Sequence, residues 1–118
     1  MNNIGEFVLT LLHSQTITHI MHLKSRSYAE HMALGAYYEG VDGLIDKFVE
    51  AYQGTHGLIE DYPSAYEPAS DPIAYLDQLN GYIYVTRKQL PQDTELQNIL
   101  DEIVALIDST LYKLRFLK

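Results

Sequence analysis

Four amphipathic segments, separated by a short, a long and a short connection, constrain the fold of this chain most. Apolar residues recur every three or four positions in each segment, which is the period of an α-helix with one buried face. The segments cover residues 4–23, 28–53, 72–90 and 94–117. We therefore expect an all-α protein built from four helices.

Residues with capping preferences mark the expected helix ends. Ser27, with a glutamate three residues later, has the capping-box pattern ahead of the second helix. Asp71, followed by proline, is placed to cap the third helix, and Asp93 the fourth. Gly54 is expected to close the second helix. The buried stripe expected in the first helix comprises Ile4, Phe7, Val8, Leu11, Leu12, Gln15, His19 and His22.

The lengths of the connections predict the topology. The polar turn at 24–27 and the connection at 91–92 are short, so each should join two antiparallel helices. The connection at about 55–70 is long. Two hairpins joined by one long crossover between helices two and three define a ferritin-like four-helix bundle. We expect one domain spanning residues 1–118, a size at which roughly two-thirds of the unfolded surface is buried on folding.

Charge and composition exclude several classes of function. The formal net charge is −8, and the few basic residues are scattered, so direct DNA binding is not expected. The chain has no cysteine, which excludes disulfides and thiolate metal sites. No apolar run approaches the ~20 residues that span a bilayer, and the first residues lack the features of a secretory signal. We expect a cytoplasmic protein that does not bind membranes.

Two histidines and two acids have spacings that indicate a metal site. His19, His31, Asp46 and Glu50 are separated by steps of twelve, fifteen and four residues. Imidazole and carboxylate are ligands that suit iron, manganese or zinc. Asp46 and Glu50 are one helical turn apart, so both carboxylates can reach one ion.

One chain cannot bring these four side chains together. His19 and His31 lie about six residues on either side of the first turn, so they should stand at the same height. Asp46 lies roughly 22 Å along the second helix from His31, whereas metal bonds are ~2.0–2.2 Å long. A second copy running antiparallel across a two-fold axis would complete the site twice. We therefore expect a homodimer at least.

This pattern resembles the Dps-type ferritins, which are small dodecameric iron-storage ferritins. The match is specific over about residues 9–54, where the two histidines and the Asp-x-x-x-Glu pair keep the family's spacing. The resemblance implies that His19 and His31 of one subunit bind iron together with Asp46 and Glu50 of its neighbour. It also implies oxidation of ferrous iron by peroxide or dioxygen, storage of the product and assembly up to a dodecamer.

The chain departs from that family at two positions. Gly35 stands where the family usually has an aspartate four residues after the second histidine, and Ile20 replaces a common tryptophan. His22 and Asp42 are candidates for a secondary metal position. We interpret His13 and His56 as structural or surface residues.

Two alternative functions remain open. The protein could be a non-catalytic dimer or cage that binds a structural zinc ion or nothing. It could also be a helical adaptor that contacts another protein through its acidic, tyrosine-rich loop at 59–68.

Overall fold

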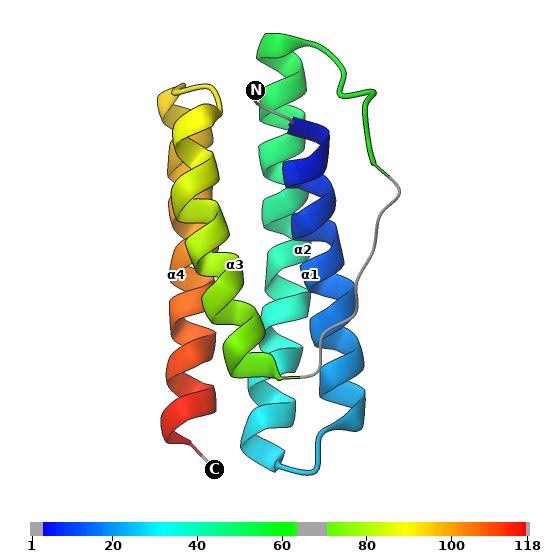
Figure 1. The fold of residues 1–118 in the computed structure, drawn as a ribbon, viewed down its shortest axis with the longest axis vertical. Helices are drawn as coiled ribbons and strands as arrows, with labels where there is room; N and C mark the ends of the chain where they lie inside the picture. The colour runs from blue at the N-terminus through cyan, green and yellow to red at the C-terminus, as the bar shows by residue number, and fades with distance from the viewer. Residues whose placement is uncertain (1–3, 64–70, 118) are drawn as a thin grey trace.

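The structure, a computed structural model, describes residues 4–63 and 71–117 and is built from helices (Figure 1). These residues form four α-helices and one short 3-10 helix, η1, with no strand among them. The all-α prediction is therefore confirmed for this part of the chain. The elements are α1 (Ile4–Lys24), α2 (Tyr28–His56), α3 (Pro72–Thr86), η1 (Arg87–Gln89) and α4 (Thr94–Phe116).

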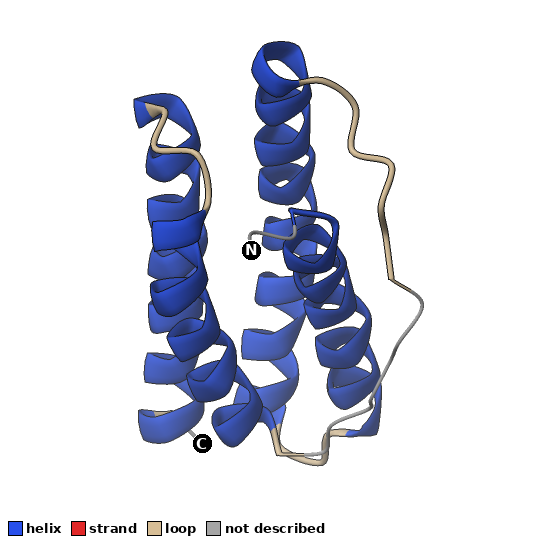
Figure 2. Ribbon diagram, turned by 45° about the horizontal axis from the view of Figure 1, so that its top comes forward, coloured by secondary structure: helices blue, strands red, loops and turns tan. Residues whose placement is uncertain are grey.

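The helices are arranged as two antiparallel hairpins. α1 lies beside α2, and α3 lies beside α4 (Figures 1 and 2). α2 also packs against α4, which makes it the central contact between the hairpins. The C-terminal end of α2 and the N-terminal end of α3 lie at opposite ends of the bundle (Figure 1), so these two helices run in the same direction. The bundle is 43 Å long, the length expected for the 29 residues of α2 at ~1.5 Å per residue.

Two of the predicted N-caps form side-chain hydrogen bonds. Ser27 Oγ accepts a hydrogen bond of 3.2 Å from the backbone N–H of Glu30. Asp71 Oδ1 accepts bonds from the N–H groups of Ile73 and Ala74, at 3.1 and 3.4 Å, and proline follows it. These bonds satisfy N–H groups that a helix leaves unpaired at its start. Both predicted caps are confirmed.

Asp93 precedes α4 but does not cap it through its side chain. Its carboxylate accepts a hydrogen bond of 3.0 Å from Nε2 of His56, the last residue of α2. The predicted side-chain cap is therefore wrong, because the Asp93 carboxylate bonds a residue of another helix instead of the N–H groups of α4. His56 links two helix ends, in agreement with a structural role.

Two helices end at different places from those predicted. α2 passes Gly54 and continues to His56, where Gly57 has φ 94° and ψ 168°. That backbone conformation is open almost only to glycine, so Gly57, not Gly54, ends the helix. The third helix is α-helical only to Thr86 and then tightens into η1 before Leu90.

The buried face of α1 is rotated from the predicted one. Leu12 and His19 are exposed, whereas Ser14 and Thr18 are fully buried. Ser14 Oγ donates to the carbonyl of Leu11 and Thr18 Oγ1 to that of Ser14, both at 2.6 Å. A hydroxyl that bonds a carbonyl of its own helix can be buried without leaving a polar group unpaired. The pattern of apolar residues alone does not include such hydroxyls, so it predicts the buried face of α1 at the wrong rotation.

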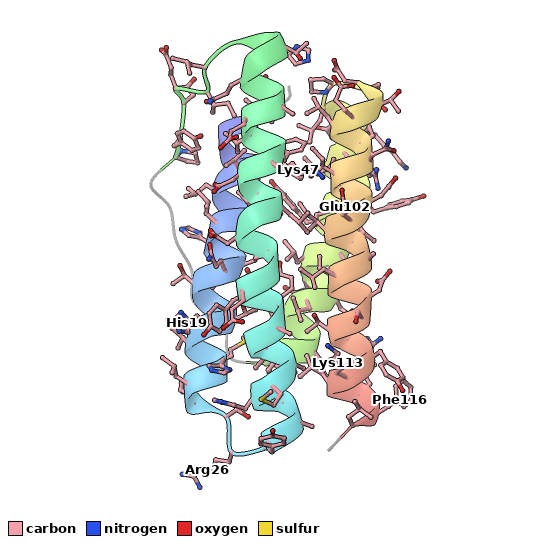
Figure 3. All side chains as sticks on the ribbon, turned by 180° about the vertical axis from the view of Figure 1, so that it is seen from behind. His19, Arg26, Lys47, Glu102, Lys113 and Phe116 are labelled. Carbon is pink, nitrogen blue, oxygen red and sulfur yellow. The ribbon has the colours of Figure 1, made fainter. Side chains whose placement is uncertain are left out.

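The core lies between the two hairpins and reaches along the whole bundle. The ring of Phe7 in α1 packs on Phe48 of α2 and Tyr82 of α3, with centroids 5.7 and 6.0 Å apart. At the surface, Lys47 of α2 pairs with Glu102 of α4 at 3.4 Å (Figure 3). The largest fully buried side chains are Tyr37, Phe7, Phe48, Leu11, Leu34, Ile45, Leu76, Ile83, Leu96, Leu100, Ile103 and Ile107.

Two sequence expectations concern membranes and the long connection. Among the described helices, none combines the length and the apolar character needed to cross a membrane. The loop proposed as an adaptor contact, 59–68, lies within the described residues only as far as Pro63. In that part, Ile59 is buried, and its N–H donates to Oε1 of Gln53 at 3.1 Å.

Candidate metal centre

The turn between α1 and α2 places three histidines near one another on the outer side of this hairpin. α1 ends at Lys24 and α2 begins at Tyr28, so only three residues separate the helices. His19 and His22 lie in the last two turns of α1, and His31 lies in the first turn of α2. His19 is exposed, and the other two are half-buried. Figure 3 shows His19 on the outer side of α1, above the turn that carries Arg26.

His22 and His31 form a reciprocal pair. Their rings stack with centroids 3.6 Å apart and an interplanar angle of 20°. His22 Nδ1 lies 2.6 Å from the backbone oxygen of His31, and His31 Nδ1 lies 2.8 Å from the backbone oxygen of His22. A carbonyl oxygen only accepts, so both Nδ1 atoms carry the proton. In the neutral rings each Nε2 then keeps a free lone pair, and neither has a hydrogen-bond partner among the described residues.

Gly35 makes room for the ring of His22. Gly35 is buried in α2, and a Cβ at this position would lie 3.0 Å from Cε1 and 3.1 Å from Nδ1 of His22. Contacts of this length are tighter than nine in ten real Cβ contacts, so the imidazole would have to shift by a few tenths of an ångström to admit a side chain at position 35. The place where the ferritin resemblance expects a carboxylate is therefore covered by an imidazole from α1.

His19 is held by an aromatic ring of α2. Its imidazole stacks on Tyr38 with centroids 4.0 Å apart and an interplanar angle of 13°. His22 touches the same tyrosine edge-on, at 5.3 Å, and its ring lies 6.2 Å from that of His19. Tyr38 thus supports the two imidazoles of α1 from one side.

The hairpin register differs from the one predicted. The ring that stacks on His31 belongs to His22, whereas His19 stands one turn further along α1 against Tyr38. His22 lies four residues before the middle of the observed turn and His31 five after it, so these two stand at matching heights. A shift of one or two residues in the position of the turn is therefore enough to place His22, in the place of His19, opposite His31.

The acidic half of the predicted site lies far along α2. Asp46 and Glu50 are exposed, as is Asp42, and none of the three makes an ion pair or hydrogen bond within residues 4–63 and 71–117. Asp46 is fifteen residues from His31, or roughly 22 Å at ~1.5 Å per residue. In the described part of a single chain, no three His, Asp or Glu side chains meet closely enough to hold an ion.

The donor chemistry of these two clusters suits a divalent metal. Metal-binding histidines usually anchor one ring nitrogen to a carbonyl or carboxylate and use the other as the ligand, which is the state of His22 and His31. Exposed, unpaired carboxylates can complete such a site. The residues therefore fit a metal ion, provided that the acids come from a second chain.

Exposed apolar side chains flank the imidazoles. Each of the three histidines is followed in sequence by one: Ile20, 45% exposed, Leu23, 70% exposed, and Met32, 52% exposed. Half or more of the surface of Leu23 and Met32 faces solvent in the single chain. Met32 lines a hollow between α2 and α4 together with Lys113 and Leu117, whereas Ile20 and Leu23 lie on α1.

Comparison with known proteins assigns the chain to a family. Residues 22–114 match the model of DUF5856, a family of unknown function. The match covers most of the chain, so the protein belongs to this family. Neither the curated proteins nor the solved structures include a significant match.

Proposed function

We propose that this protein is a metal-binding homodimer that binds ferrous iron between its subunits and promotes iron oxidation and storage, as Dps-type ferritins do. His19 and His31 of one subunit would bind the ion together with Asp46 and Glu50 of the other. The observation that carries this proposal is the separation on one hairpin of free imidazole nitrogens and unpaired carboxylates. A second copy running antiparallel brings each group to its complement.

The surface around the histidines supports the same pairing. Ile20 and Leu23 of α1 expose apolar area next to His19 and His22 in the sequence, and a second α1–α2 hairpin would cover it. A two-fold interface uses the same patch of both subunits, so the histidine end of one meets the acidic end of the other twice. The dimer would hold two equivalent sites.

We further propose a ferritin-like topology with one long crossover between α2 and α3. The shared direction of these two helices supports it, because a chain that links them has to return along the bundle (Figure 1). Closure of such dimers into a dodecameric cage is part of the same proposal. Light scattering distinguishes the two assemblies by mass.

In the proposed oxidation of ferrous iron, the side chains only bind and orient the ion. Two ferrous ions each give one electron to one molecule of peroxide, which takes up two protons and leaves as two molecules of water. No protein nucleophile is consumed. The imidazoles and carboxylates hold the iron and leave positions open for the oxidant.

A mixing experiment tests whether the site is shared. His31→Ala and Asp46→Ala are each expected to abolish ferrous binding and peroxide-dependent oxidation. When the two variants are unfolded together and refolded, about a quarter of the wild-type binding should return, because half of the dimers are mixed and each rebuilds one of its two sites. Glu95→Gln, which changes an exposed acid on α4, is the control.

The possible outcomes are distinct. A monomer without metal binding, or a mixture that recovers nothing, contradicts the shared site. Binding of zinc without any iron oxidation favours the second candidate function, a non-catalytic zinc dimer. The observation that favours this candidate is Gly35, which leaves the site without its usual aspartate.

A further inference from the structure

We propose that the hollow between α2 and α4 binds a straight-chain carboxylate of medium length, and that Lys113 pairs with the carboxylate group. The hollow lies between the first turns of α2 and the C-terminal end of α4 and has a volume of about 360 Å³. None of its residues belongs to the proposed metal site, so the inference goes beyond the proposed function and does not depend on it. The lining residues are Tyr28, Ala29, Met32, Ala33 and Ala36 of α2, with Lys113 and Leu117 from the end of α4.

The size and shape of the hollow suit an extended chain. On α2 the lining runs from Tyr28 to Ala36, which are eight residues apart, or roughly 12 Å at ~1.5 Å per residue. On α4 it runs over one helical turn, from Lys113 to Leu117. The hollow is therefore elongated along the two helices, and its volume falls within the range of ~300–1,000 Å³ that is typical of small-molecule sites.

The walls of the hollow are apolar. The three lining alanines follow one another at steps of four and three residues, which places them on one face of α2, and their small side chains leave room above that face. Tyr28, Met32 and Leu117 are large apolar side chains that are exposed to solvent in this structure. A hydrocarbon chain that fills the hollow would remove this surface from water, which favours binding.

Lys113 is the charged residue of the lining. Its side chain is half-buried, and its ammonium group has no ion pair or hydrogen bond in the part of the chain that the structure describes. Arg115, two residues further along α4, instead pairs with Asp77. Figure 3 shows Lys113 towards the end of the bundle that also carries Arg26 and Phe116. An unpaired cation beside an apolar wall matches a ligand with one anionic group and a hydrocarbon remainder.

The charge of the whole chain limits the ligand to a single negative charge. The formal net charge is −8, so the protein as a whole repels anions. The lining contains no acidic residue and one lysine, so at this place one negative charge can be balanced. An anion with several charges would meet the repulsion of the remaining surface without further cations to offset it.

A titration of the wild-type protein with octanoate tests the site directly. The alanine and methionine methyl groups are labelled with ¹³C and followed by NMR, in the absence of metal ions. Octanoate should shift the methyl signals of Met32 and of the lining alanines and leave that of Ala105 unchanged, since Ala105 lies outside the hollow. Acetate, which has the charge without the chain, should shift none of them. 1-Octanol, which has the chain without the charge, should bind at the same place about fivefold more weakly.

Two variants assign the contributions of charge and space. Lys113→Gln should bind octanoate about fivefold more weakly, no better than 1-octanol, while its binding of 1-octanol stays unchanged. Ala36→Leu places a larger side chain at an exposed position of the lining and should weaken the binding of both ligands by tenfold or more.

Each variant has a matched control. Lys88→Gln changes a lysine that lies over the ring of Tyr84, away from the hollow, and Ala105→Leu changes an exposed alanine of α4. Both controls should bind octanoate as the wild type does. The comparison of octanoate with 1-octanol on the wild type needs no variant, so it decides the role of the charge even if Lys113→Gln does not fold.

Several results would overturn the inference. Octanoate that shifts no methyl signal of the lining, or that binds Lys113→Gln as tightly as the wild type, contradicts the site. Binding to phosphatidylglycerol vesicles without binding of free octanoate would assign the surface to a membrane. A lower assembly mass of Ala36→Leu in light scattering, again without octanoate binding, would show that a second copy of the chain fills the hollow.

Discussion

The hydroxyl oxygen of Tyr37 lies 2.8 Å from Oγ of Ser14, within a core that is otherwise almost entirely apolar. Ser14 gives its only proton to the carbonyl of Leu11, so Tyr37 is the donor in this pair. Both side chains are fully buried. The contact joins the middle of α1 to α2 and satisfies both hydroxyls without water.

Removal of the Tyr37 hydroxyl should lower stability moderately. Tyr37→Phe keeps the ring and loses one buried hydrogen bond, which costs about 1 kcal/mol in the free energy of unfolding. Urea denaturation followed by circular dichroism measures the change. Tyr38→Phe is the matched control, since the Tyr38 hydroxyl has no hydrogen bond to any described residue, and it should change stability by less than about 0.5 kcal/mol.

Burial of Tyr37 should also make stability depend on alkaline pH. Burial raises the pKa of Tyr37 well above its usual value of about 10, so the native state keeps the proton where the unfolded chain releases it. This contribution is complete below pH ~10 and is lost as pH rises further, at up to about 1.4 kcal/mol per pH unit. Between pH 10 and 11 the wild type should lose stability more steeply than Tyr37→Phe. Parallel slopes for the two proteins would contradict the raised pKa.

Two glycines inside helices should respond differently to alanine. Gly81→Ala in α3 meets no atom within 4 Å and should raise the free energy of unfolding by about 0.5–1 kcal/mol through the better helix propensity of alanine. Gly35→Ala places a methyl group 3.0 Å from the His22 ring and should lose that gain. Thermal unfolding of both variants tests the difference. A Gly35→Ala protein as stabilised as Gly81→Ala would show that the His22 ring moves away freely.

Gly57 should be far less tolerant of alanine than Gly54. Gly57→Ala puts a side chain at φ 94°, ψ 168°, a conformation that costs roughly 1–3 kcal/mol for other residues. Gly54→Ala lies within α2 with open space around it and should be neutral or stabilising. Chemical denaturation of the pair measures the effect. A Gly54→Ala protein that is less stable than Gly57→Ala would place the end of α2 at Gly54, as the sequence alone predicts.

Arg87 and Gln97 should show strong coupling at the turn between α3 and α4. Arg87 Nε donates to Gln97 Oε1 at 2.9 Å, and Gln97 Nε2 donates back to the Arg87 carbonyl at 3.2 Å. Arg87 also reaches Asp101 at 2.7 Å. Arg87→Ala and Gln97→Ala should each cost about 1 kcal/mol or more, and the double variant less than the sum. A double-mutant cycle measures the coupling energy between Arg87 and Gln97. Losses of stability that simply add would contradict the coupling.

The helix starts could be predicted from sequence because they depend on local contacts. Ser27 and Asp71 bond N–H groups two or three residues ahead, so the chain near each cap carries all of the required information. The end of α2 is harder to predict from sequence, because both Gly54 and Gly57 are glycines that could end a helix. Only the backbone conformation, with its positive φ at Gly57, distinguishes them. The local sequence predicts a side-chain cap at Asp93, and this prediction fails because the carboxylate bonds His56, a residue distant in sequence.

For the candidate metal centre, the sequence determined which residue types were present and how they were spaced along each helix. Tertiary structure decided which of them touch. His22 meets His31, and His19 meets Tyr38, because the rotation of α1 follows from the buried Ser14 and Thr18 as well as from its apolar residues. Helical spacing sets where a side chain stands on its own helix, whereas contact between helices depends on turn length and rotation. A different length of the connection between α1 and α2, or a different rotation of α1, would give each imidazole another partner.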